Sequence, residues 1–179
     1  RADTNIRTID GRAFKRIAIV ADTHGPIHHA INQQLSKYDC ILHAGDLGGW
    51  NEVATQVSSF HAVLGNNDVH GKWPGPDRAY LARLPEVLKV TLRGGELVII
   101  HGHQYPVVKT RHAKLRLAFP SAKAVVYGHS HRALIDKASC PWIINPGAGG
   151  YKRTHGAAGF IDLAVLASAW RLRRIDVTE

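Results

Sequence analysis

Long apolar runs, closely spaced cysteines and, over one segment, acidic residues are all scarce in this chain of 179 residues. No apolar stretch approaches the ~18 residues that a membrane-spanning helix needs, and the N-terminal segment lacks the apolar centre of a signal peptide. The two cysteines, Cys40 and Cys140, are far apart, and Cys40 lies in an apolar stretch typical of a strand. A buried free thiol is therefore favoured at Cys40 over a disulfide or a metal ligand. These features predict a soluble protein with no membrane partner and, because its thiols are free, a cytoplasmic location.

The acidic residues are missing between Leu97 and Ile135. That segment contains six basic residues, namely Lys109, Arg111, Lys114, Arg116, Lys123 and Arg132. The formal net charge of +9 favours anionic partners in general. The segment could attract a phosphate-bearing substrate, but it is slightly more typical of the solvated face of a helix.

The length and the hydrophobic content of 45% fit one compact domain with a full core. Residues 1–15 are polar and basic, with Arg1, Arg7, Arg12 and Lys15, and are predicted to form a loosely ordered arm. A single domain is expected over residues 16–179, because no internal repeat or low-complexity tract interrupts it.

Short apolar runs rich in β-branched residues recur along the chain, and each ends in a polar cluster that contains glycine. The six runs cover residues 17–21, 40–44, 62–64, 97–100, 124–127 and 142–144. Their apolar residues do not alternate with polar ones, which is typical of strands buried on both faces. Helical patterns at residues 26–36 and 51–59 separate the first three runs and predict βαβ units with a parallel sheet. Ligands bind at the carboxyl ends of such strands, so the polar clusters are expected to converge there.

The second half of the chain carries hairpin signals. Residues 86–92 and 96–100 flank Arg93-Gly94-Gly95, and residues 160–166 and 170–177 flank a short turn around Ala167-Ser168. A mixed α/β fold with two sheets packed face to face and helices outside accommodates both halves.

Carboxylate, amide and imidazole side chains dominate the polar clusters. The candidate metal ligands are Asp22, His24, Asp46, Asn66, His101, His129 and His131. Such donors suit divalent ions such as Mn²⁺, Fe²⁺, Ni²⁺ and Zn²⁺, and the lack of thiolates disfavours a structural zinc site. Seven side chains are too many for one ion and suit two ions that share a carboxylate, for which Asp46 is the natural bridge.

Each cluster also has an ordinary structural interpretation. Asp22 could be a helix N-cap, and Gly45-Asp46 and Asn66 could be turn residues. His129 and His131, two residues apart after a buried strand, are harder to explain by packing. The occurrence of all the clusters in order at strand ends favours metals.

Two ions about 3.5–4 Å apart can clamp both oxygens of an in-line displacement at phosphorus and lower the pKa of a shared water molecule. The predicted nucleophile is then a metal-bridging hydroxide held by Asp46, so no serine or cysteine is needed. Each ion also neutralises charge on the phosphoryl oxygens in the transition state.

The motif series D-x-H, G-D, G-N-x-D, H-G-H and G-H-x-H over residues 16–165 resembles the calcineurin-like metallophosphoesterase superfamily, specifically its small YfcE-like phosphodiesterase branch. The resemblance implies a four-layer αββα sandwich with a dinuclear site, commonly activated by Mn²⁺, with Ni, Fe, Co or Zn as alternatives. It implies that the first metal is held by Asp22, His24, Asp46 and His131. It implies that the second is held by Asp46, Asn66, His101 and His129. The matching Asn145-Pro146-Gly147 is implied to shape the site.

One position departs from the pattern of many superfamily members. They carry histidine directly after the metal-binding asparagine, where it helps to protonate the leaving group, whereas this chain has Asn67. Because an amide supplies no proton at neutral pH, a preference for diesters over alkyl monoesters is expected. Asn67 and His103 are candidate substrate contacts, and His103 is also a candidate acid or a support for a ligand. His43 is expected to pack or to support a ligand, and the other histidines are expected to be ordinary: His28, His29, His61, His70, His112 and His155.

Three functions are therefore compared. The favoured one is a phosphodiesterase that acts on a small or nucleotide-like phosphodiester. A nuclease is the runner-up, because of the basic charge. A non-catalytic scaffold, similar to the retromer subunit of this fold, is disfavoured because all seven ligand positions are filled.

Overall fold

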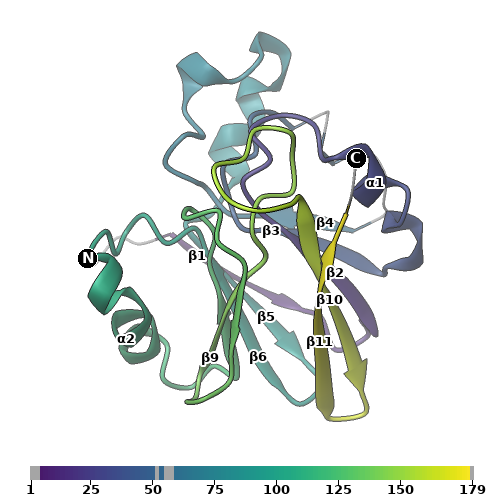
Figure 1. Cartoon of the computed structure of the whole chain (residues 1–179), viewed down its shortest axis with the longest axis vertical. Helices are drawn as coiled ribbons and strands as arrows, with labels where there is room; N and C mark the ends of the chain where they lie inside the picture. Colours follow the sequence, from purple (N-terminus) through teal and green to yellow (C-terminus); the bar gives the residue numbers. More distant parts are fainter. Residues whose placement is uncertain (1–4, 51–52, 55–58, 178–179) are drawn as a thin grey trace.

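Two β-sheets packed face to face form the centre of the computed structural model, which describes residues 5–50, 53–54 and 59–177 (Figure 1). Sheet A has the strand order β1-β5-β6-β7-β9-β8, and sheet B has the order β11-β10-β2-β3-β4. The strands of sheet A are β1 (Ile6–Asp10), β5 (Val87–Leu92), β6 (Gly95–Ile100), β7 (Ala124–Val126), β8 (Leu134–Asp136) and β9 (Trp142–Asn145). The strands of sheet B are β2 (Arg16–Val20), β3 (Cys40–His43), β4 (Phe60–Ala62), β10 (Gly159–Leu166) and β11 (Ala169–Asp176). Both sheets mix parallel and antiparallel pairs, as the mixed α/β prediction required.

Each of the six apolar runs contributes to a strand, and they divide evenly between the sheets, but only Ala62 of the run at residues 62–64 lies within its strand, β4. The first three become the parallel strands β2, β3 and β4 of sheet B, and the last three become the parallel strands β6, β7 and β9 of sheet A. Both predicted hairpins are confirmed, as the antiparallel pairs β5–β6 and β10–β11. The polar clusters therefore approach one another from two sheets rather than along the edge of one.

The packing explains why the apolar runs do not alternate. In β2, Ile17 and Ile19 face the core between the sheets, whereas Ala18 and Val20 face a second cluster on the outer side of sheet B. Cys40, which is free and buried, belongs to the core between the sheets as predicted, and Cys140 is free and exposed. Both faces of each central strand thus exclude water, which stabilises the sandwich by burial of apolar area.

The outer layers are thin, because few residues are helical. They consist of α1 (His29–Asn32), α2 (Val108–Ala118) and the 3₁₀ segments Leu35–Lys37, His70–Lys72 and Gly75–Arg83. Leu115 of α2 packs on sheet A, and Ile31 and Leu35 pack on sheet B (Figure 1). The αββα layer order holds.

The helix predicted at residues 26–36 is shorter than expected. The backbone of His28 is extended (ψ 134°), and its Nδ1 accepts the N–H of Ala30, so the helix begins only at His29. Ile27, Ile31 and Leu35 are nevertheless all buried, as their spacing predicted. The helix predicted at residues 51–59 falls largely outside the described residues, and Val53 and Ala54 form a turn and a bend.

The prediction of a loose N-terminal arm is wrong for residues 6–10. They form β1, which pairs in parallel with β5 from Ile6–Val87 to Asp10–Thr91. Alternation of Ile6, Thr8 and Asp10 with Arg7 and Ile9 gives little apolar signal, so the pairing partner, not the local pattern, determines this strand.

The basic residues of the 97–135 segment do not share one role. Lys109 and Lys114 are exposed on α2, as a solvated face predicts, but Arg111 is buried and donates to the backbone oxygens of Tyr105 (2.7 Å) and Pro106 (3.3 Å). Arg116 donates to the Pro141 oxygen (2.9 Å). Arg111 and Arg116 are therefore structural, and so is Lys123, whose Nζ donates to the Ser168 oxygen (3.3 Å).

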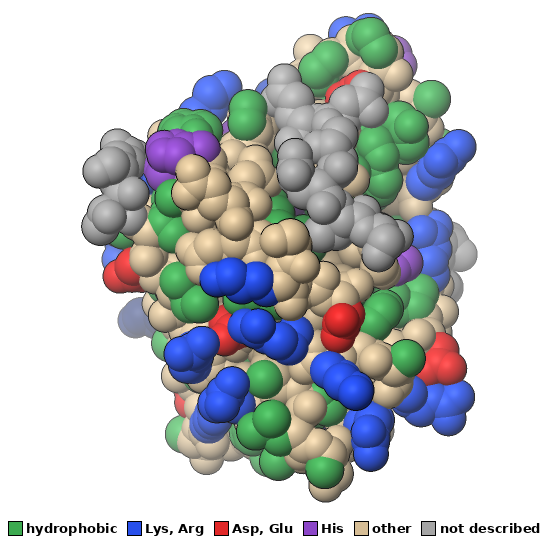
Figure 2. Space-filling view, turned by 90° about the vertical axis from the view of Figure 1, so that its right-hand side faces the viewer, with side chains coloured by type: hydrophobic (Ala, Val, Ile, Leu, Met, Phe, Trp, Pro, Cys, Tyr) green, Lys and Arg blue, Asp and Glu red, His purple; other side chains and the backbone are tan. Residues whose placement is uncertain are grey.

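Lys and Arg side chains instead gather on the side of the molecule where β10 and β11 lie (Figure 2). There the buried carboxylate of Asp162 pairs with Arg173 (2.7 Å) and Arg16 (3.4 Å) on the outer face of sheet B. Arg16 is the first residue of β2, so this patch lies at the opposite end of the strand from Asp22. In the described part of the chain, no helix has both the length and the apolarity needed to cross a membrane.

Candidate metal centre

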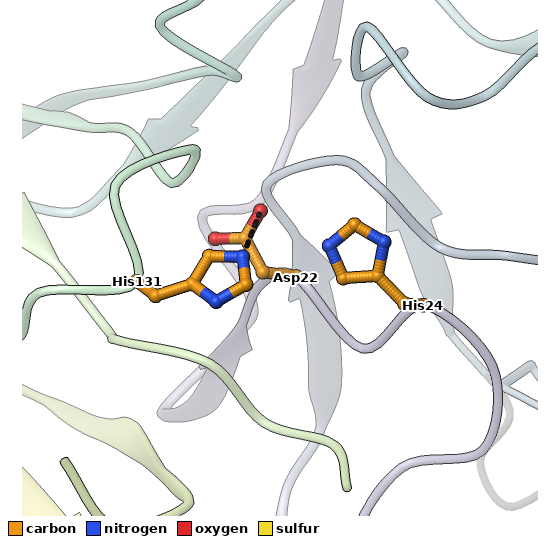
Figure 3. A group of neighbouring side chains, drawn as sticks. All are labelled: Asp22, His24 and His131. Carbon is orange, nitrogen blue, oxygen red and sulfur yellow. Dashed lines mark ion pairs between the residues drawn. The ribbon is translucent and has the colours of Figure 1, made fainter. Parts of the chain in front are cut away.

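The loops that leave β2, β3, β6 and β7 bring six of the seven candidate ligands together. Ligand atoms of Asp22, His24 and His131 lie within 4.8 Å of one another, and so do those of Asp22, Asp46 and His101. Figure 3 shows His24 and His131 on either side of Asp22, with the ion pair between His131 and Asp22 drawn. The His131 Nε2 to Asp22 Oδ1 distance is 3.8 Å.

Asp22 belongs to both groups of ligand atoms, and the Asp46 carboxylate lies close to a histidine of each group. Oδ2 of Asp46 lies 3.7 Å from Nε2 of His24 and 3.3 Å from Nε2 of His101. The bridging role of Asp46 is compatible with these distances and stays a prediction. His129 lies beside them: its backbone N–H donates to Asp22 Oδ1 (3.2 Å), and its ring is 5.3 Å from that of His101.

Backbone strain is concentrated at these residues. In the part of the chain that the structure describes, six non-glycine residues have positive φ, and five of them are candidate ligands: Asp22, His24, Asp46, His129 and His131. Such a conformation costs about 1–3 kcal/mol per residue and persists only where surrounding contacts enforce it. The left-handed turn at each strand end redirects the side chain into the shared pocket.

Two buried atoms of the centre make no hydrogen bond of good geometry, namely Oδ2 of Asp22 and Nε2 of His101, although the latter lies 3.3 Å from Oδ2 of Asp46. His101 is fully buried, and its Nδ1–H donates to the Ala44 oxygen (2.7 Å), which directs Nε2 at the two carboxylates. A carboxylate oxygen and an imidazole nitrogen left open in this way are costly unless a cation completes them. The donor set therefore fits divalent metal ions.

In the metal-free centre the electrostatics favour the ligand form at Asp46, His24, His129 and His131, whereas the raised pKa values of Asp22 and His101 favour their protonated forms. Burial raises the pKa of Asp22 to about 7, and the Asp46 carboxylate adds to this effect against the opposing charge of His101. Burial would also raise the pKa of Asp46, but the imidazole of His101 and two hydrogen bonds from Asn67 hold it below its ordinary value. Burial lowers the pKa of His24 and His129 and lowers that of His131 to about 4, so these rings are neutral at pH 7 and available as ligands.

Asn66 and Asn67 are placed differently from the expectation. Asn66 is exposed, whereas Asn67 donates to Asp46 twice, from its backbone N–H to Oδ1 (2.8 Å) and from Nδ2 to Oδ2 (2.9 Å). Asn66 as a ligand therefore stays a prediction. His103 lies near the rings of His101 (5.4 Å) and His129 (6.4 Å) and does not line the metal pocket.

The chain as a whole is similar to known phosphoesterases. The model of the calcineurin-like phosphoesterase superfamily domain matches residues 16–166. The chain belongs to this superfamily. A protein of Mycoplasma genitalium described as "Probable metallophosphoesterase" is 29% identical over 140 residues, which are 74% of this chain and 76% of that protein.

Solved structures share the fold of this chain at lower identity. One is described as a novel archaeal phosphodiesterase, with a TM-score of 0.63, 20% identity, and coverage of 89% of this chain and 99% of that one. Another is Vps29 of Entamoeba histolytica complexed with Zn²⁺, with a TM-score of 0.64, 18% identity, and coverage of 90% and 98%. The four-layer fold predicted from the motifs is thereby confirmed.

A hydrogen-bond network supports the loops that carry the candidate ligands, and the sequence indicated only part of it. Asp68, given no role there, accepts N–H groups from Asp46 (2.8 Å), Leu47 (2.9 Å) and Gly65 (2.8 Å), and the indole N–H of Trp73 (3.0 Å). Its place as the last residue of G-N-x-D was the available signal. Asn145 behaves as the motif implied, because its Nδ2 donates to the Gly128 oxygen (3.0 Å) and holds the loop that carries the two histidines.

A pocket of about 410 Å³ opens over the candidate ligands. His24, Asp46, His129 and His131 line it, together with Asn67 and the Lys152–Thr154 segment. None of the six basic residues between Leu97 and Ile135 lines it. Lys152 and Arg153, which the sequence did not single out, supply the positive charge at its rim.

Proposed function

We propose that this phosphoesterase is a phosphodiesterase that holds two divalent ions, with Mn²⁺ as the preferred species, and hydrolyses a small or nucleotide-like phosphodiester. The observation that carries the proposal is the pair of ligand groups that share Asp22, with Oδ2 of Asp22 and Nε2 of His101 left open. Two such ions would polarise the phosphoryl oxygens and lower the pKa of a water molecule for in-line attack.

The residues of the chain supply the rest of the chemistry. Asp22 and Asp46 bring negative charge that binds the cations, and the neutral rings of His24, His129 and His131 complete the two groups. Ala44 orients His101 through its carbonyl oxygen. Lys152 and Arg153 at the rim attract the anionic substrate and orient its phosphoryl oxygens.

The preference for a diester rests on Asn67. Its side-chain amide lies next to Asp46, and its Oδ1 accepts a hydrogen bond from the Lys72 ammonium (2.6 Å). Because an amide does not titrate near neutral pH, Asn67 has no proton to give to a departing alkoxide. A diester with a stabilised leaving group needs less protonation than an alkyl monoester. The description of a solved structure of this fold as an archaeal phosphodiesterase is consistent with this preference.

The test is a matrix of metals and substrates. Chelator-treated protein is reconstituted with Mn²⁺, Fe²⁺, Co²⁺, Ni²⁺ or Zn²⁺ and assayed on bis-p-nitrophenyl phosphate and on p-nitrophenyl phosphate. We expect about two ions per chain by elemental analysis and faster hydrolysis of the diester.

Two variants test the assigned ligands. Asp46→Asn and His129→Ala should each lose at least about 100-fold in kcat/KM on the diester, because even indirect changes at metal sites cost 10–100-fold. Asp10→Asn, at an exposed carboxylate paired with Arg12, is the matched control and should keep wild-type activity. Full activity of both site variants would reject the proposal, and a protein that takes up no ions and hydrolyses neither substrate would fit a scaffold instead.

A further inference from the structure

A larger cleft adjoins the metal pocket and is not needed to hold the metals. It has a volume of about 670 Å³, within the range of roughly 300–1,000 Å³ that small-molecule sites occupy. His24, Asn67 and Lys152 line both the cleft and the metal pocket, so the two spaces are continuous. A substrate whose phosphorus lies over the metals can therefore extend one ester group into the cleft.

One wall of the cleft presents an aromatic ring that is held in place. Tyr151 is 50% exposed, and its hydroxyl oxygen accepts the backbone N–H of His29 (2.8 Å) and lies 3.0 Å from the Nδ1 of the same residue. The ring stacks on His28, with the centroids 4.7 Å apart. A ring fixed from behind and exposed to solvent provides a stacking platform with little conformational entropy left to lose.

Two ammonium groups belong to the cleft, and no carboxylate is among the described residues that line it. Lys72 belongs to the same lining segment as Trp73 and Pro74, and Lys152 follows Tyr151 directly. Nζ of Lys72 donates to Asn67 Oδ1 (2.6 Å), and Asn67 Nδ2 donates to Asp46 Oδ2 (2.9 Å), so Lys72 is connected to the metal centre by two consecutive hydrogen bonds. The cleft therefore favours a group that carries its own negative charge.

We propose that this cleft binds the leaving group of the diester and that it selects a nucleotide, with a planar base on Tyr151 and a second phosphate between Lys72 and Lys152. The inference rests on the proposed function and adds the substrate class. In the reaction, water forms the new O–P bond and the P–O bond to the nucleotide breaks. One proton of the water ends on the released hydroxyl of the nucleotide and the other goes to solvent.

The kinetic test compares substrates that differ in one terminal phosphate group, which adds about −1.5 to −2 charge at pH 7. Diadenylate with a 5′-phosphate yields two AMP molecules, and diadenylate without it yields adenosine and AMP. We expect the phosphorylated form to have about 10-fold higher kcat/KM, and the Lys72→Gln/Lys152→Gln variant to lose most of that ratio. Lys114→Gln, an exposed lysine on α2, is the control and should keep the ratio.

A short 5′-phosphorylated DNA strand, assayed as a substrate, distinguishes a preference for small substrates from activity on nucleic acid. We expect its kcat/KM to be lower than that of the phosphorylated dinucleotide, because the contacts proposed for the cleft serve one base and one phosphate. A strand cleaved as well as the dinucleotide would overturn the assignment of a small substrate.

A binding measurement makes the inference independent of catalysis. AMP is titrated into metal-free protein, and backbone amide resonances near Tyr151 and Lys72 are followed by NMR. Tyr151→Leu should raise the Kd by about 10-fold, as loss of base stacking predicts, whereas Tyr151→Phe, which keeps the ring, should bind as the wild type does. Equal binding by the Leu and wild-type proteins, or an unchanged substrate ratio in the double lysine variant, would overturn the proposal even if bis-p-nitrophenyl phosphate is hydrolysed. If that diester is not hydrolysed with any metal, the proposed function itself fails.

Discussion

His43 shows how a single buried residue supports the metal centre without lining the metal pocket. Its Nδ1 accepts the N–H of Gly45 (3.0 Å), and its Nε2–H donates to Thr23 Oγ1 (2.9 Å), because the hydroxyl proton of Thr23 is committed to the Leu47 oxygen (2.9 Å). These contacts specify a neutral ring with its proton on Nε2. They also join the loop after β2 to the loop after β3, from which Asp22 and Asp46 project.

The neutral state of His43 makes stability depend on pH. Burial lowers the pKa of His43 to about 3 in the folded protein, against about 6.5 in the unfolded chain. Because the unfolded state then binds more protons, the contribution of His43 is fully present above pH ~6.5 and is lost progressively as the pH falls toward 3. Urea unfolding of metal-free protein at a series of pH values should show this loss. His43→Gln, which has no group that titrates in this range, should show a shallower slope, and an unchanged slope would contradict the assignment.

Asp68 acts at the scale of the elements. One carboxylate accepts N–H groups from the loop after β3, from the loop after β4, and from the Trp73 indole. The strained backbone at Asp46 (φ 59°) is held by these bonds on one side and by Asn67 on the other. The position of the ligand is thus specified by contacts between loops that are about twenty residues apart in the chain.

Replacing the Asp68 carboxylate by an amide should loosen both loops. Asp68→Asn retains one acceptor oxygen and places an NH₂ group against backbone donors, so the free energy of unfolding should fall by about 2–3 kcal/mol. Metal affinity, measured by calorimetric titration, should fall by about 10–100-fold. Asp39→Asn is the matched control, because Asp39 accepts the N–H groups of Lys15 (2.7 Å) and Arg16 (3.0 Å) at the start of β2. It should lower stability and leave metal affinity unchanged, and equal effects on affinity would contradict a specific role for Asp68.

At the scale of the whole molecule, the metal centre joins the two sheets. Asp22 and Asp46 follow strands of sheet B, whereas His101, His129 and His131 follow strands of sheet A. Ions bound by both sets would connect the halves of the sandwich and neutralise carboxylates that burial otherwise destabilises. Metal binding and global stability should therefore be coupled.

Thermal unfolding measures that coupling. At a free Mn²⁺ concentration about 100 times the Kd, binding to the native state alone adds about 2.7 kcal/mol, which corresponds to a rise in Tm of roughly 5–10 °C for a chain of this size. Excess chelator should abolish the rise, and Asp46→Asn should show little of it. A Tm that does not respond to any of the five divalent ions would contradict the fit of this donor set to metals.

Much of the candidate site could be predicted from the sequence, because its ligands stand directly after buried strands. Asp22 and His131 were identified from glycine-bounded polar clusters at the ends of apolar runs, and the runs themselves follow from local hydrophobicity. The positions of Asn66 and Asn67 could not be predicted in this way. Which of two adjacent amides points at Asp46 depends on the turn conformation, which the composition of a turn does not specify.

The sequence by itself determined most of the strands, the two hairpins, the set of candidate ligand side chains and, through the motif series, the superfamily. Only the tertiary structure decided that β1 joins sheet A, that Asp68 ties two loops together, and that Lys72 meets Tyr151 and Lys152 around one cleft. The physical reason is the distance along the chain over which each kind of interaction acts. Periodicity and glycine placement act over a few residues, whereas contacts between separate loops depend on how the two sheets pack.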